Sequence, residues 1–249
     1  MKVSIVTICY NSGETIRDAI ESVIEQDYQN IEYIIVDGKS IDGTLGIVAE
    51  YKDNIAKIIS EKDKGIYDAM NKGVTAATGD IVGILNSDDL YANKHVISDM
   101  VNSIGDADAA YADLVYVTRD DTDHITRAWK AGDYKKGMFK KGWMPPHPTF
   151  FVRKECYDRH GLYSLELKSS ADYELMLRFI HKHEISVRYH PQTIIKMRLG
   201  GQSNVSIKNR LAANKEDRNA WKMNGLSPGI ANLRKPLSKI GQFLRKDNS

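Results

Sequence analysis

The sequence predicts an α/β fold in which a mixed, mainly parallel β-sheet is flanked by helices. Two observations indicate this fold. Apolar, β-branched runs alternate with helical segments over residues 1–105, and this alternation is typical of parallel sheets whose faces are covered by helices. Polar clusters follow the strands, and such sheets bind ligands beyond the carboxyl ends of their strands. Four polar strand ends on one edge favour a single binding site over four unrelated turns.

The elements of the first half follow from hydrophobic periodicity. Apolar residues three and four apart predict helices, and the longest such stripe comprises Ile66, Ala69, Met70, Gly73, Val74 and Ala77. The predicted strands are 3–9, 31–37, 56–60 and 80–85, and the predicted helices are 16–24, 45–52, 66–77 and 96–104.

The second half, residues 106–223, carries fewer motifs. Strands at 109–117 and 124–129 are expected to form a hairpin around an acidic turn. The other expected elements are a lysine-rich loop at 133–142, a strand reached through 144–152, a helix at 171–181, strands at 185–190 and 194–199, and a polar helix at 204–223.

Composition excludes several classes of protein. The apolar fraction of 42% is that of an ordinary globular chain, and a net charge of +2 gives no case for nucleic-acid binding. Cys9 and Cys156 form neither a metal-type pair nor a disulfide framework, so a reducing cytosol is expected. The N-terminal apolar run is too short for a signal peptide, and no apolar segment of 18 residues occurs.

Asp88 and Asp89 stand side by side at the end of an apolar run, within ILNSDDLY at 84–91. Two like charges this close destabilise each other unless a positive charge lies beside them. The pair could begin a helix, where Asp is favoured, or lie in a solvated turn. It could also hold a divalent cation, because hard cations take carboxylate oxygens.

The order of motifs along the chain resembles glycosyltransferase family 2, bacterial surface-polysaccharide type. The motifs are TICYN, VDGKSIDGT, SEKDKGIYDAMNKG followed by TGD, LNSDD, SSADYELMLR and GGQS, which together cover roughly residues 1–203. The resemblance implies the GT-A fold, which is Rossmann-like, with a C-terminal helical extension. Residues 1–105 would form its nucleotide-sugar-binding half and 106–223 its acceptor-binding half, followed by a linker and tail at 224–249.

The resemblance implies an Asp-x-Asp-type metal site at the aspartate pair. Mg²⁺ or Mn²⁺ would bridge the two phosphates of a nucleotide-sugar, with Asp89 as the main ligand and Asp88 touching the metal, the ribose or the donor sugar. A dication there stabilises the charge that develops on the leaving nucleoside diphosphate. The alternative is that the pair caps a helix starting near Asn93.

By the same resemblance, Thr7, Tyr10 and Asn11 would lie against the base and ribose. Asp37 would accept a hydrogen bond from uracil N3 or a ribose hydroxyl, although its position is also a plain turn signal. Asp63 would be the second base contact.

Asn71 is expected in the donor site as well. Its neighbour Met70 departs from the family pattern, because many members carry arginine there, near the diphosphate. Lys62 or Lys64 could supply that charge instead.

Asp172 matches the position of the family's general base. Inversion by direct displacement needs one base on the face opposite the leaving group. The residue could equally be the N-cap of the helix that follows it, and Glu174 is the second candidate for the base.

The acceptor or phosphate side would include His147, Trp143, Gly201 and Ser203. His147 could line the acceptor site or be a rigid loop residue between two prolines, and Trp143 could stack on a sugar or belong to the core. Gly201 and Ser203 belong to GGQS, which resembles a loop near the donor phosphates and could also be a simple turn.

The tail at 231–249 has Leu233, Leu237, Ile240 and Leu244 at helical spacing among lysines and arginines. A short basic amphipathic helix is typical of membrane-surface binding, and packing back onto the domain is the alternative. We therefore expect a cytoplasmic protein, peripheral on the inner face of the plasma membrane.

The function expected from the resemblance is metal-dependent, inverting transfer of one sugar, a hexose or N-acetylhexosamine. The donor would be a nucleotide-sugar, most simply a UDP-sugar, and the acceptor a hydroxyl of a lipid-linked surface glycan. A non-catalytic nucleotide- or sugar-binding protein and a nucleotidyltransferase are the alternatives. The chain lacks the Gln-x-x-Arg-Trp signature of processive synthases.

Overall fold

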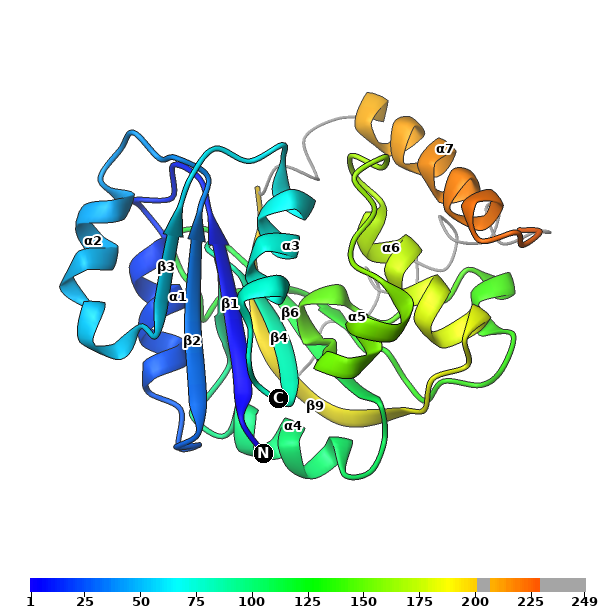
Figure 1. Ribbon diagram of the computed structural model, residues 1–249, viewed down its shortest axis with the longest axis horizontal. Helices are drawn as coiled ribbons and strands as arrows, with labels where there is room; N and C mark the ends of the chain where they lie inside the picture. The colour runs from blue at the N-terminus through cyan, green and yellow to red at the C-terminus, as the bar shows by residue number, and fades with distance from the viewer. Residues whose placement is uncertain (201–206, 229–249) are drawn as a thin grey trace.

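The computed structural model describes residues 1–200 and 207–228, with the side chains of residues 207–214 excepted. In this part of the chain, nine strands form one mixed sheet in the order β3-β2-β1-β4-β8-β6-β9-β5, with β7 paired to β6 (Figure 1). The strands are β1 Val3–Cys9, β2 Ile31–Asp37, β3 Lys57–Ser60, β4 Ile81–Asn86, β5 Asp89–Tyr91, β6 Ala109–Val117, β7 Ile125–Trp129, β8 Phe151–Arg153 and β9 Val187–Arg198.

The helices cover both faces of this sheet, as the sequence predicts. They are α1 Ile16–Ile24, α2 Thr44–Glu50, α3 Ile66–Ala76, α4 Val96–Ile104, α5 Lys154–His160, α6 Ala171–Met176 and α7 Ile207–Met223, with short turns η1 Lys52–Asn54, η2 Met138–Lys141, η3 His147–Thr149 and η4 Leu177–Lys182. No helix in residues 1–200 and 207–228 has the length and apolar character needed to span a bilayer.

Strand β1 lies in the middle of the parallel half and is buried along its whole length. It pairs in parallel with β2 and with β4, in a register that sets Cys9 beside Asp37 and Ile8 beside Asn86. Because parallel strands all point the same way, their polar ends meet at one edge. The mainly parallel sheet of the first half is therefore confirmed.

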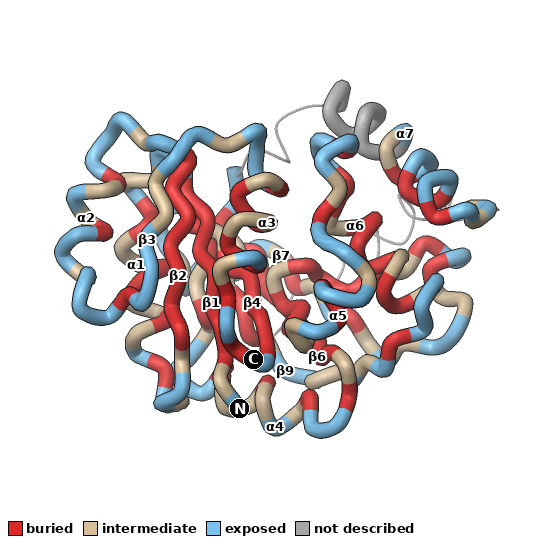
Figure 2. Tube along the Cα trace, viewed as in Figure 1, coloured by how far each residue is buried: buried red, intermediate tan, exposed pale blue. Residues whose placement is uncertain are grey.

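Two apolar layers hold the helices on the sheet, and the central strands of the sheet are buried (Figure 2). α1 and α4 pack on one face, and α3, α5 and α6 lie on the other, where Trp221 of α7 joins the core. Gly73 brings α3 close to the sheet, because a Cβ at this position would lie 2.1 Å from the side chain of Val6. A larger residue at Gly73 would push α3 away from β1 and displace everything that α3 carries.

Some predicted elements were wrong. The strands expected at 185–190 and 194–199 form the single strand β9, whose register with β6 shifts around Asp113. Pro191 cannot donate to the ladder, and the strand continues through this irregularity because proline is tolerated at bulges. The helix expected at 171–181 is α-helical only to Met176 and continues as the wider π-turn η4, which lets both Phe179 and Ile180 face the core.

The stripe predicted on α3 was wrong at its first residue. Ile66 is 47% exposed, and Tyr67 is buried in its place at 8% exposure. The helix α5 and the short strand β5 carry no sequence pattern that predicted them. β5 exists because it pairs antiparallel with β9, which aligns Asp89 with Met197. Asp89 therefore lies in a strand, and the next helix, α4, begins only at Val96.

Candidate active site

Hydrogen bonds join the loops at the carboxyl edge of the sheet to one another. Asn11 has a left-handed backbone, with φ of 50°. Its amide donates to Ser40 Oγ over 2.9 Å, and its side-chain oxygen accepts from the Ile41 amide over 3.0 Å. The Ser12 and Ser87 hydroxyls are 2.7 Å apart. These contacts hold the loops after β1, β2 and β4 together as one surface.

A strip of bare backbone at Gly38 lies between Tyr10 and Asp63. A Cβ at Gly38 would be 2.5 Å from Asp63 Oδ2 and 3.3 Å from the Tyr10 ring. The Tyr10 ring is 55% exposed, and Asp63 Oδ1 accepts from the Gly65 amide over 2.9 Å. The arrangement brings two predicted donor contacts, Tyr10 and Asp63, to one place. A flat ring, a carboxylate and a glycine backbone suit a planar, hydrogen-bonding group.

Asp37 and Thr7 lie beneath this edge and are both fully buried. Asp37 accepts from the Ser60 hydroxyl over 2.7 Å and from the Ser40 amide over 3.2 Å, so in this structure it fixes the loop that carries the bare strip. The Thr7 hydroxyl lies 3.0 Å from the Tyr33 hydroxyl on β2. Both residues support the surface from within.

The aspartate pair lies at the end of β4, beside the Ser12–Ser87 contact. Asp89 has no exposed surface, and its Oδ2 accepts from the side-chain amide of Asn86 over 2.8 Å. Of the described residues, none donates to Asp89 Oδ1 or to Asn86 Oδ1, and both atoms are buried. Buried oxygens without a donor destabilise a fold, so these two atoms fit a cation or a donor that is bound during function.

Electrostatics at the pair agree with this arrangement. Burial, and then the charge of Asp88, raise the pKa of Asp89 well above its ordinary value. Burial also raises the pKa of Asp88, while the charges of Arg119 and Arg198 oppose that rise. Within residues 1–200 and 207–228, no cluster of three or more His, Cys, Asp or Glu could hold a metal alone. A metal ion here would need further oxygen ligands from a bound molecule, such as phosphate.

Arg198 is a further residue of the site that sequence reasoning missed. It is 4% exposed, donates to the backbone oxygens of Asp88 and Arg119 over 3.2 Å each, and forms an ion pair with Asp18 on α1. An arginine at the end of β9, just before the glycines of GGQS, was the only signal in the sequence. The buried guanidinium fixes the backbone of the aspartate turn.

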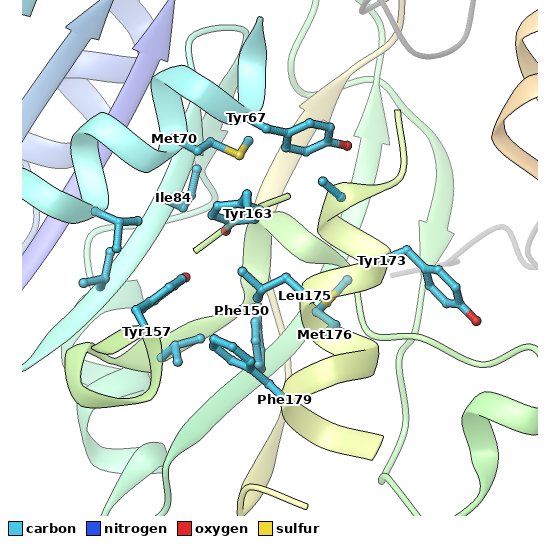
Figure 3. Close-up of a cluster of buried hydrophobic side chains, with 14 of the residues drawn as sticks. Tyr67, Met70, Ile84, Phe150, Tyr157, Tyr163, Tyr173, Leu175, Met176 and Phe179 are labelled. Carbon is cyan, nitrogen blue, oxygen red and sulfur yellow. The ribbon is translucent and has the colours of Figure 1, made fainter. Parts of the chain in front are cut away.

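Asp172, the predicted base, lies in the first turn of α6, and Tyr67 of α3 donates from its hydroxyl to Asp172 Oδ1 over 3.1 Å. The Tyr67 ring stacks on Tyr163 with centroids 5.9 Å apart (Figure 3). Sequence reasoning missed both tyrosines.

Glu174, the second candidate for the base, is 3% exposed and engaged on both oxygens. Arg178 donates to Oε1 over 2.8 Å and to Oε2 over 3.0 Å, and Asn224 donates to Oε1 over 2.9 Å. A carboxylate held this way is structural, so the geometry favours Asp172. Asn224, which was predicted to begin a linker, is buried and belongs to this contact.

The position of Met70 is apolar. Met70 is 3% exposed and lies in the core beneath α3. Lys62 and Lys64 are exposed in the loop before α3, and Lys72 pairs with Glu61 at 3.1 Å.

Asn71 binds protein backbone in this structure. Its side chain donates to the Tyr163 carbonyl over 2.9 Å and accepts from the Tyr163 amide over 2.8 Å. It therefore anchors the loop before α6 to α3.

The residues predicted on the acceptor side are placed as follows. His147 is buried, its Nε2 is 2.8 Å from the Tyr163 hydroxyl, and burial lowers its pKa. Trp143 is half-buried, donates to the Ala131 carbonyl over 2.8 Å and meets the Phe139 ring edge-on. Gly201 and Ser203 lie outside the described residues, as does the tail at 231–249.

The sheet and its polar edge define an α/β domain with a ligand-binding type of edge at the carboxyl ends of its parallel strands, and comparison with known proteins gives its family. Residues 4–160 match the model described as Glycosyl transferase family 2, and the chain belongs to this family. A PGL/p-HBAD biosynthesis glycosyltransferase of Mycobacterium tuberculosis is 29% identical over 213 residues, which cover 82% of this chain and 80% of that protein. The protein is therefore a glycosyltransferase.

Solved structures are similar in fold. Staphylococcus aureus TarS 1–349 in complex with UDP-GlcNAc has a TM-score of 0.68 at 18% identity, and the match covers 90% of this chain and 65% of that one. The mannosyltransferase PcManGT from Pyrobaculum calidifontis, in complex with GDP-Man and Mn²⁺, has a TM-score of 0.69 at 17% identity, over 96% and 69% of the two chains. These likenesses show the GT-A fold.

Proposed function

We propose that this glycosyltransferase moves one hexose or N-acetylhexosamine from a UDP-sugar to a hydroxyl of a lipid-linked glycan, in surface-polysaccharide synthesis. The nucleotide-sugar part of this proposal is supported by two buried side-chain oxygens, one on Asn86 and one on Asp89, that accept no hydrogen bond from the described residues. They lie at the same sheet edge as the Tyr10–Gly38–Asp63 surface, which suits a base. A nucleoside diphosphate joins a planar base to phosphates that can share a divalent cation.

The roles follow from the placement of each group. Tyr10 and Asp63 would contact the base, with Thr7, Asn11 and Asp37 supporting that surface. Asp89 would hold Mn²⁺ or Mg²⁺, with Asp88 on the metal or the donor sugar. When bound, the ion supplies positive charge to the two phosphates of the leaving group. Fold neighbours that hold UDP-GlcNAc, or GDP-Man with Mn²⁺, support a nucleotide-sugar donor.

Asp172 would act as the general base in a single displacement. The acceptor oxygen bonds to the anomeric carbon as the bond to the diphosphate breaks. The acceptor proton passes to Asp172, and UDP leaves with the bonding electron pair. One displacement from the opposite face inverts the configuration at the anomeric carbon. Replacing such a base costs about 10²- to 10⁴-fold in rate.

The acceptor half of the proposal rests on a named relative and on the basic tail. The mycobacterial relative is named for PGL/p-HBAD biosynthesis, and a glycolipid acceptor would suit attachment through the basic tail at 231–249. His147 and Trp143 border Tyr163 and the aromatic cluster around Phe139, respectively. From there they would shape the acceptor side, with Gly201 and Ser203 on the phosphate side.

A non-catalytic nucleotide-binding role is the second candidate. The buried Met70, where many members of the family carry arginine, favours it, because that helix position then offers no cation to the diphosphate. Turnover separates the two. A binding protein would bind UDP and release none from UDP-sugars.

Calorimetric titration with UDP and with GDP, each with and without Mn²⁺, tests the donor site. We expect Mn²⁺-dependent binding of UDP that Asp89→Asn abolishes and Asp106→Asn, at an exposed position, leaves intact. Binding of GDP alone would contradict the base contact of Asp63. If neither nucleotide bound, the transferase assignment of this edge would be wrong. Wild-type turnover in Asp172→Asn would contradict the base.

A further inference from the structure

Tyr67 lies between the donor side and the proposed base. α3 begins at Ile66, three residues after Asp63, and Asp63 fixes the turn into the helix through the Gly65 amide. One residue into the helix, the Tyr67 side chain turns inward and reaches Asp172, which is 105 residues away in the chain.

The hydroxyl of Tyr67 donates and the carboxylate of Asp172 accepts. Burial, followed by the charge of Asp172 and its hydrogen bond, raises the pKa of Tyr67 far above its ordinary value, so the phenol stays protonated. In the described part of the chain, Tyr67 is the one residue that bonds to this carboxylate, at Oδ1. The second oxygen, Oδ2, is left for the acceptor hydroxyl.

The position of the Tyr67 hydroxyl is fixed from several sides. Its ring is 8% exposed and stacks on Tyr163 at an interplanar angle of 17°. Both backbone groups of Tyr163 are held by Asn71, one turn further along α3. The Tyr163 hydroxyl is held in turn by His147 at 2.8 Å. Two aromatic rings and a clamped backbone therefore leave the phenol little freedom (Figure 3).

We propose that Tyr67 is the positioning residue of the general base, and this inference rests on the proposed role of Asp172. Its hydrogen bond fixes the rotamer of Asp172 and leaves Oδ2 for the acceptor. A base that is already fixed avoids the cost of being oriented in each turnover.

The test compares Tyr67→Phe with Tyr173→Phe. The first variant removes only the hydroxyl that donates to Asp172 and keeps the ring that stacks on Tyr163. The second removes a hydroxyl from the next residue of α6, also buried, whose partner is Trp221 at 2.9 Å. Release of UDP from UDP-N-acetylglucosamine and UDP-glucose, with water as acceptor, is followed from pH 4 to 9.

Tyr67→Phe should lower kcat about tenfold or more across this pH range and leave Mn²⁺-dependent UDP affinity unchanged. Tyr173→Phe should keep the wild-type kcat. The other titratable groups near Asp172 are His147 and Tyr163, and both variants retain them. An unchanged kcat in Tyr67→Phe would overturn the inference.

A double-mutant cycle in urea unfolding, with Tyr67→Phe and Asp172→Asn, tests the bond without any donor. The two effects should be non-additive, and strict additivity would also overturn the inference. Asp172→Asn separates the two proposals. Full turnover in Asp172→Asn contradicts the role of Asp172 as the base. Loss of turnover in Asp172→Asn, together with wild-type turnover in Tyr67→Phe, contradicts only the positioning role of Tyr67.

Discussion

The side-chain amide of Asn86 donates to Asp89 Oδ2 over 2.8 Å, so that Oδ1 of the same carboxylate lies buried without a donor from the described residues. This relationship links the end of β4 to β5 across a tight turn. It also orients one carboxylate oxygen away from Asn86, and Asn86 retains a buried oxygen of its own that lacks a donor. A ligand that is itself hydrogen-bonded is typical of protein metal sites.

Asn86→Ala should therefore weaken Mn²⁺-dependent UDP binding about tenfold or more, because Asp89 loses the group that orients it. Calorimetric titration of UDP at fixed Mn²⁺ measures the change. Asn102→Ala, at an exposed position on α4, is the matched control and should bind as wild type. Unaltered affinity in Asn86→Ala would mean that Asp89 needs no orienting partner.

The carboxylate of Asp89 should destabilise the metal-free protein at neutral and alkaline pH. Because its folded-state pKa is raised, folding favours the protonated form. The contribution of this carboxyl to folding stability is therefore fully present below its pKa in the unfolded chain. It is lost as the pH rises through its pKa in the folded protein. Asp89→Asn should be more stable than wild type at pH 8 in EDTA.

Urea unfolding at pH 5 and pH 8 measures this effect. The difference between wild type and Asp89→Asn should shrink at the lower pH, because the raised pKa favours protonation of the wild-type carboxyl there. Asp106→Asn, which removes an exposed carboxylate, should show no such pH dependence. A variant less stable than wild type at both pH values would show that Asp89 is satisfied by the protein itself.

Much of the site could be predicted from the sequence, because its residues follow strands. Tyr10 comes directly after the apolar run of β1, and Asp63 and Asp89 follow the ends of β3 and β4 by three residues. Parallel strands bring such ends together. Tyr67 could not be predicted this way. Ile66 and Tyr67 are both apolar enough to begin the stripe of α3, and the one that turns inward is Tyr67, whose ring stacks on Tyr163 from a distant part of the chain.

Contacts between distant segments account for the other omissions. β5 is three residues long, and its partner β9 is more than 100 residues later in the chain. A strand this short has no periodicity of its own. Likewise, Arg198 is identified by the Asp88 carbonyl that it meets rather than by its neighbours in sequence. Sequence periodicity reports local burial, and it does not report which buried group faces which.

The tail at 231–249 lies outside the described residues, and the prediction made for it stands on its basic, amphipathic sequence. Deleting residues 231–249 should abolish sedimentation with vesicles of anionic phosphatidylglycerol, because the lysines, arginines and leucines together provide the attraction. Vesicles of neutral phosphatidylcholine are the control and should bind either form weakly. Equal sedimentation of the two proteins with anionic vesicles would refute the prediction.

Glu32 should stabilise the fold through a set of hydrogen bonds at the amino end of the sheet. Burial alone would raise its pKa, but bonds from Lys2 at 2.7 Å, Ser4 at 2.5 Å and Thr78 lower it from 4.5 to about 2. Its contribution is present above the unfolded pKa and is lost as pH falls through the folded one. Glu32→Gln should cost roughly 2 kcal/mol at pH 7 and less at pH 3, with the exposed Glu25→Gln as control.

Gly38 should be required for donor binding rather than for folding. Gly38→Ala would bring a methyl group within 2.5 Å of Asp63 Oδ2 and 3.3 Å of the Tyr10 ring, so the surface proposed for the base would have to open. We expect about a tenfold or greater loss of UDP affinity.

Gly46→Ala is the matched control, because nothing lies within 4 Å of its added Cβ on α2. That control should keep UDP affinity and gain about 0.5–1 kcal/mol of stability from helix propensity. Wild-type affinity in Gly38→Ala would show that the nucleotide binds away from this strip of backbone.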